Sequence, residues 1–90
     1  MNKVILSKTA QKQLKKIPTH IRNNFHIWTG QVEMLTIQEI RKISGYHDEP
    51  LFGSKKGQRS IRLSRAYRAF YIEKEDKITI KVIEVNKHEY

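Results

Sequence analysis

Two arginines, one carboxylate and one imidazole in the second half of the chain have the side-chain types needed to cut RNA. In an alternating run, Arg62 takes the face opposite the apolar Ile61. Glu84 and His88 share one parity near the end of the sequence, and Arg68 begins the strand that follows a short turn. If the strand register allows, these four side chains surround one concavity on an open face of a sheet.

The chemistry expected of this set is metal-free cleavage by internal attack. The 2′-hydroxyl must lose a proton, the phosphorane must have its charge balanced, and the leaving 5′-oxygen must gain a proton. His88 can carry out one proton transfer near neutral pH. Arg62 and Arg68 keep their protons and can form two parallel hydrogen bonds to phosphate oxygens. Stabilisation of the transition-state charge in this way is often the largest part of catalysis. By spacing alone the signal is weak, because an ordinary surface histidine and solvated arginines would show the same pattern, so both readings stay open.

Other candidates are less specific. His47, beside Asp48 in a glycine-rich segment, is either a second acid/base or a loop histidine. The spacing of the histidines and carboxylates matches no metal-ligand pattern, and there is no phosphate-binding loop or dinucleotide fingerprint. We therefore expect no metal and no cofactor.

The charge of the chain favours a polyanionic partner. The 90 residues hold 18 Lys and Arg against 9 Asp and Glu, a formal net charge of +9. Six basic residues and no acidic one lie between positions 53 and 68. Such a run is either a solvated face or a site for phosphates.

The absence of cysteine excludes disulfides and thiolate chemistry. The sequence also has no apolar run long enough for a signal peptide or membrane span, so a cytoplasmic protein is expected.

The elements that must position these residues follow from periodicity. Lys3–Ser7 predicts a first strand, and Ser7 or Thr9 can cap a helix that runs to about Ile17. Thr19 is the expected cap of a second helix, whose stripe of apolar residues at steps of three and four includes Ile21, Phe25, Trp28, Val32 and Leu35.

A third short helix is expected over Ile37–Ile43, because Thr36 and Glu39 form a capping box. An irregular loop follows over Gly45–Gly57. Three strands complete the chain, over Ser60–Ser64, Arg68–Ile72 and Ile78–Val85. This order predicts a single α+β domain over residues 1–90, with an N-terminal strand, two or three helices and an antiparallel β-meander.

Four segments resemble the RelE/HigB superfamily of bacterial toxins: residues 45–51 (GYHDEPL), 57–63 (GQRSIRL), 67–71 (YRAFY) and 84–90 (EVNKHEY). The resemblance covers essentially the whole chain and implies a microbial-ribonuclease-like fold. It implies a toxin of a type II toxin–antitoxin system that cuts mRNA in the A site of the 30S ribosomal subunit, leaving a 2′,3′-cyclic phosphate. It also implies an antitoxin partner that covers or distorts the site.

The resemblance assigns expected roles to individual positions. Arg62 contacts the phosphate, Arg68 stabilises the transition state, His88 is the leading acid/base, and Tyr90 orients or stacks a base. Apart from the resemblance, the residues themselves suggest supporting roles for Glu84, which would hold His88 or an arginine, and for His47. The expected RNA-binding residues are Lys55, Lys56, Arg59 and Lys87. Ser60 stands where some relatives have a lysine, so the identity of the general base stays open.

Two other functions remain alternatives at this stage. ParE-like toxins share the fold, lack the nuclease residues and poison gyrase. A non-catalytic module that binds RNA or the ribosome would also use a basic face. The combination of Arg62, Arg68 and His88 favours the nuclease.

Overall fold

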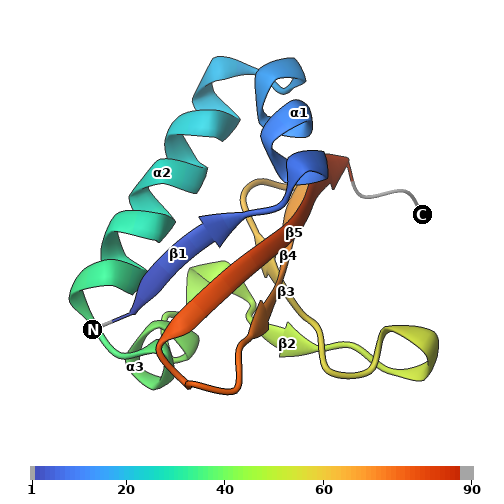
Figure 1. The fold of residues 1–90 in the computed structure, drawn as a ribbon. Coiled ribbons are helices and arrows are strands. Elements are labelled where there is room, and N and C mark those ends of the chain that lie inside the picture. The colour runs from blue at the N-terminus through green and yellow to red at the C-terminus, as the bar shows by residue number, and fades with distance from the viewer. Residues whose placement is uncertain (1, 88–90) are drawn as a thin grey trace.

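A five-stranded sheet organises the fold, with its strands in the order β1-β5-β4-β3-β2 (Figure 1). The computed structural model describes residues 2–87. The elements are β1 (Lys3–Leu6), α1 (Lys8–Lys16), α2 (Thr19–Met34), α3 (Ile37–Arg41), η1 (Ser44–Tyr46), β2 (Glu49–Pro50), η2 (Gly53–Lys55), β3 (Arg59–Arg62), β4 (Tyr67–Glu73) and β5 (Thr79–Lys87). The predicted α+β order, with a first strand, three helices and a meander of β3, β4 and β5, is confirmed.

The first strand joins the sheet beside the last one. β1 pairs with β5 in parallel, with Val4 opposite Ile80 and Leu6 opposite Val82, whereas all other strand pairs are antiparallel. The sheet is therefore mixed. The three helices follow β1 in the chain, and they pack on one side of the sheet that β1 and β5 join.

Local capping fixes where the helices begin. The hydroxyl of Ser7 accepts the backbone N–H of Ala10 at 3.0 Å, so Ser7, and not Thr9, is the cap of α1. Thr36 caps α3 in the same way through the N–H of Glu39, but α3 ends at Arg41, short of the predicted Ile43. The expectation for Thr19 was wrong, because it is the first residue of α2, and Pro18 stands at the N-cap without a side-chain hydrogen bond.

The core lies between the helices and one face of the sheet. Ile21, Phe25, Trp28 and Val32 of α2 are buried, as their spacing predicts, while Leu35 is partly exposed. They face a buried row on the strands made of Ile61, Ala69, Tyr71, Ile80, Val82 and Val85. The ring centroid of Trp28 lies 5.4 Å from that of Tyr71.

Among the described residues, no helix combines the length and apolar character needed to cross a bilayer.

A bulge in β5 changes which residues face the core. Phe70 pairs with Glu84, but the next residue, Tyr71, pairs with Val82, so Ile83 is left as an extra residue. Strict alternation along the strand would place Ile83 on the same buried face as Val85. Ile83 is only half-buried, and Val82 takes the core position instead.

The segment expected to be an irregular loop is partly ordered into short elements. The two residues of β2 pair with β3, with Glu49 opposite Ser60. The backbone before β2 passes through the left-handed region at His47, where φ is 45°. Gly57, with φ at 95°, closes the loop before β3 in a conformation that residues with a side chain rarely adopt.

Candidate functional site

The register of the meander aligns the predicted arginines on the sheet face that the helices do not cover. Arg62 of β3 pairs with Arg68 of β4, and Arg68 pairs with Asn86 of β5. Two residue pairs further along, Ser60, Phe70 and Glu84 form the next row on the same side of the sheet. We call the side of the sheet that carries Ser60, Arg62, Arg68, Phe70, Glu84 and Asn86 the open face. The structure thus brings together Arg62, Arg68 and Glu84, as strand parity predicts.

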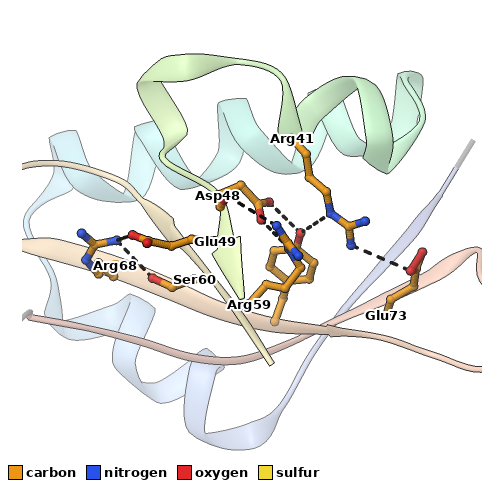
Figure 2. A network of polar contacts seen from close by, with 8 residues as sticks. Arg41, Asp48, Glu49, Arg59, Ser60, Arg68 and Glu73 are labelled. Carbon is orange, nitrogen blue, oxygen red and sulfur yellow. Dashed lines mark hydrogen bonds and ion pairs between the residues drawn. The ribbon is translucent and has the colours of Figure 1, made fainter. Parts of the chain in front are cut away.

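Arg68 is held in place by two oxygen atoms on the open face (Figure 2). Its Nη1 donates to the hydroxyl of Ser60 at 3.2 Å and lies 3.9 Å from Oε1 of Glu49. Ser60 is almost fully buried, whereas the Glu49 carboxylate is 62% exposed. An exposed carboxylate beside an ordered guanidinium combines a proton acceptor with a phosphate-binding group.

Arg62 contacts the predicted supporting residue His47. Nη1 of Arg62 lies 3.4 Å from Nε2 of His47, and Nε of Arg62 donates to the backbone carbonyl of Ser64 at the same distance. Because a guanidinium has only donors, this contact is a hydrogen bond only when His47 is neutral and accepts at Nε2. His47 and Glu49 therefore approach the two arginines from one short segment.

Glu84, the other supporting residue, contacts a different partner from the one expected. Its Oε2 accepts a hydrogen bond from Nδ2 of Asn86 at 3.2 Å. Neither Arg62 nor Arg68 forms an ion pair with it among the described residues. His88 and Tyr90, which carry the expected acid/base and stacking roles, lie outside the described residues.

The four predicted RNA-binding residues do not share a face. Lys55 and Lys56 are exposed, and the ammonium of Lys55 lies 5.2 Å from the centre of the Phe70 ring on the open face. Arg59 pairs with the buried Tyr71 in the sheet, and Lys87 pairs with Tyr67, so both take the opposite parity.

Arg59 instead belongs to a polar network at the edge of the core (Figure 2). Its Nε donates to Oδ1 of Asp48 at 2.6 Å, and the Tyr71 hydroxyl donates to Oδ2 of Asp48 at 2.6 Å. Arg41 donates to the Tyr71 oxygen at 3.4 Å and lies 3.8 Å from Glu73. Burial lowers the pKa of Arg59, but the hydrogen bond and charge of Asp48 outweigh it and raise the pKa overall. Burial, reinforced by Asp48, also raises the pKa of Tyr71, so its hydroxyl stays a donor.

A hollow of about 570 Å³ opens beside Arg68. Its lining combines aromatic, apolar and charged side chains, namely Glu49, Pro50, Leu51, Phe52, Lys55, Ser60, Arg68 and Phe70. Phe52 is 81% exposed, so its ring is accessible from solvent. Sequence reasoning missed Glu49, Phe52 and Phe70 as site residues. Phe70 could have been found, because it shares the parity of Arg68 on one strand.

No cluster of three or more His, Asp or Glu side chains that could hold a metal ion occurs within residues 2–87. The open face instead offers guanidinium groups for an anion, one exposed carboxylate and one imidazole for proton transfer, and aromatic rings beside them. These groups suit a phosphodiester with an attached base.

Comparison with protein families gives one match that spans nearly the whole chain. The model described as the ParE toxin of type II toxin–antitoxin systems, parDE, matches residues 4–89. No match was found among curated protein sequences.

Solved structures with the same fold come from several toxin–antitoxin systems. The chain is similar to the toxin–antitoxin complex RelBE2 from Mycobacterium tuberculosis, with 22% identity over 97% of this chain and 98% of that chain and a TM-score of 0.59. The YoeB/ParE toxin from Agrobacterium tumefaciens matches with 15% identity over 97% and 99%, and a TM-score of 0.69. The DinJ–YafQ complex from E. coli matches with 17% identity over 97% and 92%, and a TM-score of 0.74. At these identities the likeness establishes a shared RelE-like fold.

Proposed function

Because the chain belongs to the ParE toxin family of type II toxin–antitoxin systems, we propose that it is a toxin that acts as a metal-independent endoribonuclease on mRNA at the ribosome. The observation that carries the proposal is the pair of arginines, Arg62 and Arg68, which lie side by side in register on the open face. An exposed carboxylate, Glu49, stands 3.9 Å from the second arginine. This set supplies both phosphate binding and proton transfer, which a purely anion-binding surface does not need.

In the proposed reaction, Glu49 accepts the proton of the 2′-hydroxyl as that oxygen bonds to phosphorus. Arg62 and Arg68 stabilise the charge of the phosphorane. The bond from phosphorus to the 5′-oxygen then breaks, and an imidazole gives that oxygen its proton. His88 remains the first candidate for this acid. His47 is the second, and it can donate only in its protonated form, in which its Nε2 no longer accepts from Arg62. The products are a 2′,3′-cyclic phosphate and a 5′-hydroxyl.

The hollow beside Arg68 is the proposed place for a base next to the scissile phosphate. Phe52 and Phe70 offer ring faces, and Lys55 offers a charge within reach of a backbone phosphate. Stacking on aromatic side chains is tolerant of base identity, so this hollow binds single-stranded RNA and leaves codon choice to the ribosome.

A second candidate function is gyrase inhibition, which a resemblance to ParE-like toxins implies, and the matching family is the ParE toxin family. The arginine pair with its carboxylate supports the nuclease instead. A module that only binds RNA is the third possibility. All three functions are compatible with an antitoxin partner, and we propose that an acidic segment of this partner covers the basic open face.

The test compares the wild type with Arg68→Ala in translating ribosomes, with mRNA cuts mapped by primer extension. We expect cuts in phase with codons from the wild type and a loss of about 10²- to 10³-fold in the variant, as for removal of one charge-stabilising group. Arg65→Ala is the matched control, because Arg65 is an exposed arginine in the bend outside the strands, and it should keep the cuts. Intact mRNA together with inhibited supercoiling in a gyrase assay would contradict the nuclease and support the gyrase candidate.

A further inference from the structure

We propose that Asp48 is a positioning residue, which holds the segment around β2 so that Glu49 faces Arg68. The proposal rests on the proposed nuclease function for its catalytic consequence. The anchoring of the segment is independent of that function, because it rests on contacts within the chain.

Burial separates Asp48 from its neighbour Glu49. The side chain of Asp48 is 0% exposed, whereas that of Glu49 is 62% exposed. Successive side chains of an extended segment point to opposite sides. Asp48 therefore points under the sheet edge while Glu49 points onto the open face.

Both carboxylate oxygens of Asp48 are bound to groups fixed by the core. Arg59 donates to one and Tyr71 to the other, each at 2.6 Å. Tyr71 is itself fully buried and packs against Trp28. A buried carboxylate is stable only when it is paired and hydrogen-bonded, so Asp48 has one preferred position, and that position is set by the core.

Apart from its contact with Arg68 and the hydrogen bond from the Leu51 N–H to the carbonyl of Gln58 at 2.9 Å, little else fixes the proposed catalytic carboxylate. β2 has only two residues, and the second is Pro50, which has no N–H to donate to the ladder. On the other side, His47 takes a left-handed backbone conformation that is uncommon for residues other than glycine. The segment therefore depends on the anchor between these two residues. Because displacement of a catalytic group by about 1 Å can cost about 100-fold in rate, the anchor has a direct consequence for catalysis.

The test is a double-mutant cycle on mRNA cleavage with Asp48→Asn, Glu49→Gln and the double variant. If Asp48 acts through Glu49, we expect Asp48→Asn to lower kcat about 10- to 100-fold with KM nearly unchanged. The double variant should then be no slower than Glu49→Gln alone. Glu73→Gln is the control, because it removes a carboxylate at the far end of the same network, 3.8 Å from Arg41, and it should cleave like the wild type. Independent, multiplying losses in the double variant would overturn the proposal.

Two further measurements test the proposal even if Asp48→Asn does not fold or the wild type cleaves no RNA. Tyr71→Phe removes only one of the two donors to Asp48 and keeps the ring in the core, so it replaces Asp48→Asn in the cycle if that variant fails to fold. Hydrogen exchange of the backbone amides at residues 47–49 should be faster in the anchor variant than in Glu73→Gln. Equal protection would overturn the anchor even if the wild type cleaves no RNA, whereas absent cleavage with faster exchange would overturn only the proposed nuclease.

Discussion

Neighbouring cations in the basic segment have different surroundings because alternate residues of a strand face opposite sides of a sheet. Arg62 lies on the open face beside Arg68, whereas Arg59, three residues earlier, forms an ion pair with the buried Asp48. The charge count therefore overstates the number of cations available to a phosphate. It also hides a second use of arginine, which is to make the burial of a carboxylate possible.

Phe70 gives the prediction that belongs to single residues. We expect Phe70→Leu to weaken binding of single-stranded RNA about 5- to 150-fold, since stacking of a base on an aromatic side chain contributes about 1–3 kcal/mol. The measurement is the fluorescence change of an RNA that contains 2-aminopurine, titrated with protein. Ile72→Ala is the control, because Ile72 lies two residues further along β4, toward the acidic turn of Glu75 and Asp76, and it should bind like the wild type. Equal affinity of Phe70→Leu and the wild type would contradict a base in this hollow.

Strand parity predicts half of the candidate site, and long-range pairing decides the rest. The alternation around Ile61 is enough to place Arg62 opposite the core, and the same rule places Glu84. Glu49 could not be found in this way, because β2 is too short for periodicity and follows a left-handed residue. Its place beside Arg68 depends on contacts between distant residues, such as the pairing of Glu49 with Ser60 eleven positions later in the chain.

At the level of elements, α1 protects the part of β5 that β1 leaves unpaired. β1 pairs only with residues Thr79 to Val82. Beyond that point the hydroxyl of Ser7 donates to the carbonyl of Ile83 at 2.6 Å, and the side chain of Gln13 accepts the N–H of Val85 at 2.6 Å. The backbone groups of a free strand edge can pair with another chain. These two hydrogen bonds occupy backbone groups of β5, so α1 and its cap protect this edge.

Ser7 has two roles in this cover, and we expect Ser7→Ala to lower the free energy of unfolding by about 2 kcal/mol. Loss of the helix cap accounts for about 1 kcal/mol and loss of the bond to Ile83 for about 1 kcal/mol more. Urea denaturation measures the change. Thr36→Ala is the control, since Thr36 caps the five-residue α3 at an exposed site and should cost about 1 kcal/mol or less. Equal losses in the two variants would contradict the second role of Ser7.

The elements whose signals are local are those that the sequence predicts well. The caps at Ser7 and Thr36 and the apolar stripe of α2 depend on residues three or four apart. The parallel pairing of β1 with β5 and the bulge at Ile83 depend on contacts between distant segments. Periodicity within one strand carries no information about such contacts, so strict alternation back from Val85 selects Ile83 for the core, whereas the structure buries Val82 there.

For the whole molecule, the question is whether RNA binding depends on the net charge of +9 as a whole or on the cations of the open face alone. The first 32 residues contain six basic residues and no acidic one, and four of them are exposed on α1 (Lys8, Lys12, Lys15, Lys16). The helices lie on the other side of the sheet from the open face (Figure 1). The chain therefore carries two basic surfaces, and only one of them adjoins the arginine pair.

Salt dependence separates these two surfaces. If about four cations at the open face touch phosphates, the plot of log K against log salt for single-stranded RNA should have a slope of about −3. Replacement of Lys55 and Lys56 by glutamine should reduce its magnitude to about 1.5, because two of the four contacts are lost. The charge-matched variant with Lys12→Gln and Lys16→Gln has the same net charge but an intact open face, so its slope should stay near −3. If the two double variants share one slope, binding follows the total charge of the molecule, and the assignment of RNA to the open face is wrong.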